Sequence, residues 1–229
     1  MTLTQTMISA IAGETVEELL ARRSPGVPEG RAIRRRLSAR LKVESGPDVL
    51  AVGLAIASAP AMKTARARWV GWELINKHRP ALEALDPAMV DRLGRGMSSW
   101  DEVDGFCLYI AGPAWLRGLI DDPHVVAWAN SPDLWLRRAA LVATVVLNSR
   151  SHGGRGDAAR TLLIAGMLID DDEDMVIKAL SWALRVLIAR DRVAVEQFLA
   201  RHENRLAARV KREVRTKLRT GRKTVAKDL

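Results

Sequence analysis

Three stretches of the chain decide its predicted fold: RARWVG at 66–71, RAALVA at 138–143 and KALSWA at 178–183. Each stretch begins with a cation, continues with small residues at close-packing positions and runs on as an apolar stripe with helical spacing. The second begins 72 residues after the first and the third 40 residues after the second, so the longer interval fits two units of roughly 40 residues. Helices of this kind cannot bury their apolar faces alone, and we expect pairs of them to stack into a curved solenoid.

The rest of the chain agrees with this prediction. Signals for β-strands are nearly absent, because the chain has one Tyr and two Phe and lacks alternating β-branched runs. Most predicted helices start at an Asp or a Pro, and one continuous helix is expected over 61–77. The sequence therefore predicts an all-α protein, a HEAT-like helical repeat solenoid (α–α superhelix) with a concave basic groove. Its predicted organisation is a single domain over 1–220 and a flexible basic tail over 221–229.

The formal net charge is +9, and the basic residues are unevenly placed. They are concentrated over 31–42 and again over 201–227. Such a distribution favours a polyanionic partner through counterion release, and duplex DNA or RNA is the first candidate. The alternative is that the charge serves solubility or an anionic surface.

Several other classes of protein are disfavoured. The most apolar run, Val49–Pro60, is too short to span a bilayer, and the first residues do not resemble a secretory signal. We therefore expect no membrane partner and a cytoplasmic protein of bacterial type, associated with the nucleoid through DNA. The single Cys107 excludes an internal disulfide and a cysteine zinc cluster, and the four His residues show no metal-ligand spacing, so no metal site is expected. The Gly-rich turn 149–156 lacks the ending of a Walker loop and is a weak phosphate candidate only.

Tryptophan is unusually frequent for a chain so poor in other aromatic residues. Seven Trp residues occur, and four of them are expected to pack in the core, namely Trp69, Trp72, Trp115 and Trp128. Trp100 is different, because Asp104 follows it by four residues and both therefore project from one helical face. Asp101 is as readily explained as a residue that caps the helix. Asp104, one turn inside the helix, either pairs with a cation or serves a site.

Two further segments combine an indole with a cation at helical spacing. Trp135 and Arg138 lie three residues apart, and Trp182 and Arg185 repeat this spacing. Each pair could bracket a phosphate group. Arg137 and Arg138 point about 100° apart on a helix, so only one of them is expected to face a groove. An inward Arg can equally be a strut between helices, its stem packed and its head paired.

These segments carry a resemblance to a known family. WDEVD at 100–104, WANSPDLWLRRAAL at 128–141 and IKALSWALR at 177–185 resemble, in order and spacing, the DNA alkylation repair family of HEAT-like DNA glycosylases, the AlkD type. The resemblance extends from about Ala61 to Leu218. Before Trp69 the chain has no aromatic residue, whereas the family commonly has an aromatic-bearing segment there.

The resemblance implies roles for four residues. Asp104 takes the place of the catalytic Asp, Trp100 and Trp182 those of two sugar-facing indoles, and Arg138 that of a phosphate-binding Arg. Enzymes of this type excise cationic N3- and N7-alkylated purines from duplex DNA, including bulky adducts, without a metal, another cofactor or a lysine Schiff base. Positive charge moves onto the deoxyribose as the glycosidic bond lengthens, and indole faces and a carboxylate can stabilise that charge.

We therefore expect a monomeric, monofunctional alkylpurine DNA glycosylase, a hydrolase of N-glycosyl bonds in base excision repair. Its catalytic residues are expected to be Asp104, Trp100 and Trp182. The residues expected to bind DNA are Arg138, Trp135, Arg137, Arg185, Arg34, Arg35, Lys178, Lys211 and Arg212. The alternatives are a non-catalytic HEAT-like DNA-binding protein and a protein-binding scaffold.

Overall fold

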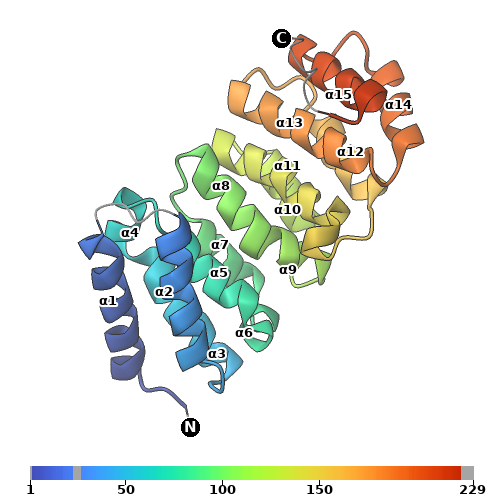
Figure 1. Ribbon diagram of the computed structural model, residues 1–229. Coiled ribbons are helices and arrows are strands. Elements are labelled where there is room, and N and C mark those ends of the chain that lie inside the picture. The colour runs from blue at the N-terminus through green and yellow to red at the C-terminus, as the bar shows by residue number, and fades with distance from the viewer. Residues whose placement is uncertain (1, 23–26, 223–229) are drawn as a thin grey trace. The chain divides into compact units, whose positions relative to one another are not determined.

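The computed structural model describes residues 2–22 and 27–222, and every regular element among them is helical (Figure 1). The all-α class is confirmed, and the packing of successive helices against one another fits a helical repeat protein. Two compact units divide the chain, Met1–Ile120 and Asp121–Leu229. Each is described below by itself. The predicted tail lies mostly outside the described residues, which end at Arg222.

The first unit is built around one central helix. Helix α3 packs against α1, α5 and α6, and α5 packs in turn against α2. Its α-helices and its π-helical segment η1 are α1 (Gln5–Ala21), α2 (Val27–Arg40), α3 (Gly46–Ser58), α4 (Pro60–Thr64), α5 (Trp69–Lys77), α6 (Arg79–Glu83), α7 (Pro87–Gly94), α8 (Trp100–Phe106), η1 (Cys107–Ala111) and α9 (Gly112–Leu116).

Small residues let α3 and α5 approach closely. A Cβ atom at Gly71 would lie 2.4 Å from the carbonyl oxygen of Gly53, which is far inside van der Waals contact. Gly71 is the last residue of the RARWVG stretch, so a small residue in this stretch does allow two helices to pack closely, as the sequence predicts.

The second unit repeats one packing arrangement. Helix α13 packs against both α11 and α15, and it also contacts the shorter helices α12 and α14. Its elements are α10 (Asp122–Ala129), α11 (Leu134–Asn148), the 3-10 turn η2 (Arg150–His152), α12 (Ala158–Met167), α13 (Asp174–Leu187), α14 (Arg192–Arg201) and α15 (Ala208–Thr220).

The structure separates a real internal repeat from an apparent one. Arg138 and Lys178 are both the fifth residue of their helices, α11 and α13, so the 40-residue interval corresponds to one structural unit. Arg66, by contrast, lies in the turn that precedes α5 and not within a helix. The stretch at 66–71 is therefore out of register with the other two.

That turn also overturns the prediction of one helix over 61–77. The chain instead forms α4, a turn over 65–68 and α5. Arg66 has a φ of 53°, and it is the one non-glycine residue with positive φ among the described residues. No Gly or Pro occurs between Ala61 and Val70, the part of the stretch that contains the turn, so helical periodicity alone predicted an unbroken helix there.

An Asp or a Pro begins most of the α-helices in the described residues, as the sequence predicts. Asp121, Asp133, Asp157 and Asp191 each accept a hydrogen bond from a backbone N–H in the first turn of the following helix. These bonds satisfy donors that a helix end leaves without partners. Among the described residues, no helix combines the length and apolar character that crossing a bilayer requires.

Candidate nucleic-acid interface

Helix α8 presents an indole to solvent at its first residue. Trp100 is 52% exposed, which is unusual for the largest apolar side chain, and Asp104 lies one turn later and is half-buried. The residues between them, Glu102 and Val103, are buried. Trp100 and Asp104 therefore share the less buried side of α8, as their spacing predicts.

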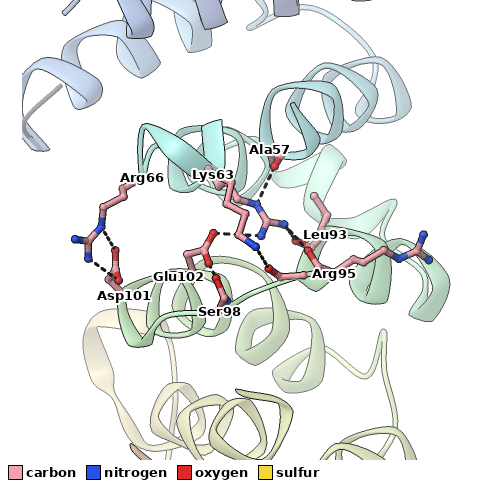
Figure 2. A network of polar contacts seen from close by, with 10 residues as sticks. Ala57, Lys63, Arg66, Leu93, Arg95, Ser98, Asp101 and Glu102 are labelled. Atoms are coloured by element: carbon pink, nitrogen blue, oxygen red, sulfur yellow. Dashed lines mark hydrogen bonds and ion pairs between the residues drawn. The ribbon is translucent and has the colours of Figure 1, made fainter. Parts of the chain in front are cut away.

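A buried arginine fixes the start of α8 (Figure 2). The guanidinium of Arg68, which is 6% exposed, donates to the carbonyl oxygens of Ala57 (2.9 Å) and Leu93 (2.8 Å) and pairs with Glu102 at 3.4 Å. Glu102 in turn accepts from the backbone N–H of Ser98 at 3.0 Å. A charge-assisted network of this kind holds the first turn of α8 against α3 and α7.

A second arginine pairs with the same turn from the surface. The Nη2 atom of Arg66 lies 2.8 Å from Asp101 Oδ1, and Nε donates to Oδ2 at 3.1 Å. Burial opposes ionisation of Asp101, but hydrogen bonds from Arg66 and Ser99 outweigh it and lower the pKa of this carboxyl. Asp101 is thus an ion-pair partner, whereas the residue at the N-cap position is Ser99.

Of the two cations predicted to bind DNA from α2, one is paired and the other is exposed. Arg34 is partly buried, and its Nε lies 3.4 Å from Glu73 Oε2 on α5, close enough for an ion pair but without hydrogen-bond geometry. Arg35 is exposed. The structure therefore gives Arg34 a contact within the first unit and leaves Arg35 as the cation available to a partner.

In the second unit, Trp182 lines an open cavity of about 590 Å³ together with four cations. The cations are Arg185 on α13, Lys217 on α15, and Arg150 and Arg190 from the loops that follow α11 and α13. No carboxylate lines this cavity. We call it the Trp182 pocket. An indole among positive charges, in a pocket that no carboxylate lines, suits the sugar–phosphate backbone of a nucleic acid.

Two of the four cations are held by the fold. Arg190 donates to the carbonyl oxygens of Asn148 (2.8 Å) and Gly154 (2.7 Å). Arg185 Nε donates to Ser181 Oγ at 3.2 Å and lies 3.7 Å from Glu213 on α15. Burial lowers the pKa of Arg185 and Glu213 partly offsets this, so the guanidinium stays charged at neutral pH.

The glycine-rich turn that follows α11 is shaped by a close approach. A Cβ atom at Gly154 would lie 2.1 Å from the carbonyl oxygen of Val146, so only glycine fits there. Gly153, with a φ of 84°, closes the 3-10 turn in the left-handed region that glycine tolerates. This turn carries Arg150 to the rim of the Trp182 pocket.

Arg138 and Arg137 are both contacts within the second unit. Arg138 is 5% exposed and donates to the carbonyl oxygen of Met175 on α13 at 2.6 Å. Arg137 pairs with Asp171 at 2.6 Å and donates to the carbonyl oxygen of Pro132 at 2.9 Å. Both have the geometry of struts, the alternative that the sequence left open.

Of the other residues predicted to bind DNA, the two lysines have partners within the second unit. Lys178 pairs with Asp174 at 2.6 Å, and Lys211 donates to the carbonyl oxygen of Glu203 at 3.0 Å. Arg212 is exposed, and Trp135 is half-buried in the first turn of α11. In the second unit and α2, Arg35 and Arg212 are thus the predicted cations most open to a partner, and Trp182 lines an open pocket, whereas Arg185 lines that pocket but pairs with Glu213.

A model of the family described as DNA alkylation repair enzyme matches residues 27–218. The chain belongs to this family. A search among curated proteins found no match.

Membership in the DNA alkylation repair family gives the protein a role in alkylation repair, with DNA as the partner. The matched range begins at α2, well before the position at which the resemblance of individual motifs begins. The basic helix α2 is therefore part of the family's region, although it carries no aromatic residue.

Sequence reasoning did not single out three residues of the Trp182 pocket in this member of the DNA alkylation repair family: Arg150, Arg190 and Lys217. Arg150 stands in the turn that the sequence marked as a weak phosphate candidate. Lys217 lies in the basic run over 201–227, but nothing in the sequence links it or Arg190 to Trp182, because α13, α15 and the turn come together only in the folded unit. In the described residues no group of three His, Cys, Asp or Glu side chains has the arrangement of a metal site.

Proposed function

We propose that this protein is a monofunctional DNA glycosylase that hydrolyses the N-glycosidic bond of cationic N3- and N7-alkylated purines in duplex DNA. One observation carries the proposal. Trp100, which is 52% exposed, and Asp104 occur together on one side of α8 in a member of the DNA alkylation repair family. A repeat scaffold has no use for an exposed indole one turn before a carboxylate.

The chemistry needs little from the protein beyond these two groups. An alkyl group on N3 or N7 makes the purine cationic, and therefore a good leaving group. As the bond to C1′ lengthens, positive charge develops on the deoxyribose, and the face of an indole attracts it by about 0.5–2 kcal/mol when water is excluded. The carboxylate of Asp104 adds electrostatic stabilisation and orients the attacking water. The base leaves with the bonding electrons, and water adds to C1′.

The Trp182 pocket supports the same proposal from the second unit. Its indole offers a second face to a deoxyribose, and its four cations suit the flanking phosphates. Exposed Arg35 and Arg212 would extend the backbone contacts. No side chain in this set selects one base over another, which favours recognition of a labile charged lesion rather than of base shape.

The test is release of 7-methylguanine from a duplex that contains it. The wild-type protein is expected to release the base and leave an abasic site without strand cleavage. Asp104→Asn is expected to abolish release while duplex binding remains. Glu83→Gln, which removes an exposed carboxylate paired only with Arg79 on α6, is the matched control and is expected to release base at the wild-type rate.

The other outcomes separate the alternatives. Tight binding of the duplex by the wild-type protein with no release of base would reject the enzyme and leave a DNA-binding protein. Release that persists in Asp104→Asn would reject the role of that carboxylate. Failure to bind duplex even at low salt would leave a protein-binding scaffold.

A further inference from the structure

A second cation-lined pocket lies in the first unit. Its volume is about 250 Å³, and its wall is the corner between α3 and α4 (residues 57–60) together with Lys63, Arg68, Arg92, Arg95 and Gly96. Four of these side chains are cationic and none is acidic. We call it the Arg92–Arg95 pocket. The sequence gave no signal for it, and none of these residues belongs to the site proposed above.

Arg68, in the wall of the pocket, is fixed in place by hydrogen bonds to backbone carbonyl oxygens. Arg68 is anchored by the carbonyl oxygens of Ala57, Leu93 and Arg95, at 2.9, 2.8 and 3.2 Å. Its one carboxylate partner is Glu102, 3.4 Å away. Because the carbonyl oxygens fix the guanidinium and Glu102 pairs with its charge, Arg68 gives the pocket a rigid wall, and the charge available to a ligand comes from Lys63, Arg92 and Arg95.

Two exposed arginines stand at the pocket without a carboxylate. In 2–22 and 27–222, half of the exposed arginines of the first unit are in ion pairs, as Arg40 is with Glu14 and Arg79 with Glu83. No such pair forms at the side chains of Arg92 and Arg95 within these residues. Figure 2 shows the Arg95 guanidinium pointing away from the Arg68 network, although its backbone carbonyl takes part in it.

Lys63 completes the set. Its ammonium donates to the carbonyl oxygen of Gly96 at 2.9 Å, which places it over the turn after α7 (Figure 2). A lysine ammonium has three N–H donors, so two remain for a ligand. The pocket therefore combines a positioned ammonium, a rigid guanidinium and two guanidinium groups that are open to an anion.

We propose that the Arg92–Arg95 pocket binds a phosphate group. Arginine presents paired N–H donors that match phosphate oxygens, and two arginines with a lysine supply both charge and geometry. The volume is below the roughly 300–1,000 Å³ typical of small-molecule sites, which suits one phosphate group rather than a base or a whole nucleotide. The first source of that phosphate is the backbone of bound DNA, and in this respect the inference rests on the proposed function. A free phosphate has the same chemistry.

The decisive measurement is the salt dependence of binding to an undamaged duplex, followed by fluorescence anisotropy. Each phosphate neutralised by the protein adds about 0.9 to the slope of log K against log salt concentration. Arg92→Ala/Arg95→Ala is expected to lower the magnitude of this slope by about 1, with weaker binding at low salt. Arg92→Lys/Arg95→Lys keeps the charges and is expected to retain the slope. Arg79→Ala, which removes an exposed arginine already paired with Glu83, is the control and is expected to change nothing.

A titration with inorganic phosphate distinguishes the two sources. A wild-type response that disappears in Arg92→Ala/Arg95→Ala, with no change in the DNA salt slope, assigns the pocket to free phosphate. Loss of slope assigns it to the DNA backbone. A double variant that keeps its melting temperature and changes neither measurement overturns the proposal.

The same proteins separate this inference from the proposed function. At saturating protein, Arg92→Ala/Arg95→Ala is expected to release 7-methylguanine at the wild-type rate, because the pocket grips backbone and does no chemistry. If the wild-type protein releases no base but the salt slope still falls, the glycosylase proposal fails and the phosphate pocket stands. If base is released and the double variant changes neither the salt slope nor the response to inorganic phosphate, the phosphate pocket fails and the glycosylase proposal stands.

Discussion

Arg66 reaches Asp101 from a left-handed backbone: its φ is 53°, and its Nη2 lies 2.8 Å from the carboxylate. A non-glycine residue in this region costs roughly 1–2 kcal/mol, which glycine would avoid. The side chain therefore offsets a conformational penalty by holding the first turn of α8, next to Trp100. Position 66 carries two opposing contributions, and substitution can separate them.

The first prediction compares Arg66→Gly with Arg66→Ala. Both variants lose the ion pair, but only glycine relieves the backbone, so Arg66→Gly is expected to melt several degrees higher than Arg66→Ala. Thermal unfolding followed by circular dichroism measures the difference. Equal melting temperatures would mean that residue 66 does not adopt the left-handed conformation in solution. Base release is expected to fall in both variants, because each frees the turn that carries Trp100.

The second prediction concerns acid. The pKa of Asp101 is lowered below its usual value of 3.8, because hydrogen bonds from Arg66 and Ser99 outweigh the opposing effect of burial. The ion pair therefore stabilises the fold fully above about pH 4, and this contribution is lost as the pH falls through the lowered pKa. Asp101→Asn is expected to melt below the wild type at pH 6, and the gap is expected to narrow at pH 3. A gap that stays constant with pH would contradict the assignment.

The third prediction concerns the buried Arg68. Arg68→Met leaves Glu102 buried without its cation, and breaking a buried pair in this way costs about 3–5 kcal/mol. Urea unfolding is expected to show a loss of this size, and Arg68→Met/Glu102→Gln is expected to recover part of it. Arg79→Met serves as the surface control and is expected to leave the free energy of unfolding nearly unchanged. A loss in Arg68→Met as small as that of the control would show that Arg68 does not anchor α8.

The fourth prediction distinguishes two kinds of tryptophan. Trp182 is half-buried at the rim of its pocket, whereas Trp72 is fully buried in the first unit. Trp182→Ala is expected to leave the melting temperature nearly unchanged and to slow base release by about tenfold, near 1.4 kcal/mol in the transition state. Trp72→Ala is expected to destabilise the fold by about 3–5 kcal/mol instead. Unchanged single-turnover release in Trp182→Ala would remove the indole from the mechanism.

Local sequence patterns predicted the helices well, because helix periodicity and Asp caps act over a few residues. They failed at Arg66, where the chain turns without a Gly or Pro. They also could not show which cations are already paired. Arg34, Arg137 and Arg138 meet Glu73, Asp171 and the carbonyl of Met175, which lie more than thirty residues away in the sequence. Spacing within one helix carries no information about such partners.

The candidate site was predicted in the same uneven way. The four-residue spacing predicted that Trp100 and Asp104 project from one face of a helix, and the structure agrees, whereas the exposure of Trp100 is known only from the structure. Only part of the Trp182 pocket could be predicted from the sequence, because Trp182 and Arg185 share a helix but Arg150 and Lys217 come from other elements. Recognition of the family depended on three short motifs in order, and these lie in helices α8, α10–α11 and α13.

The division between paired and open cations has a practical consequence for handling this repair protein. Mobile ions weaken contacts between solvent-facing charges and a polyanion far more than they weaken a pair that is sealed from water, such as Arg68 with Glu102. Moderately concentrated buffer should therefore strip co-purifying nucleic acid from the chain while leaving its helices packed. Every affinity comparison should start from protein that has been washed in this way. Residual nucleic acid would otherwise occupy the exposed arginines.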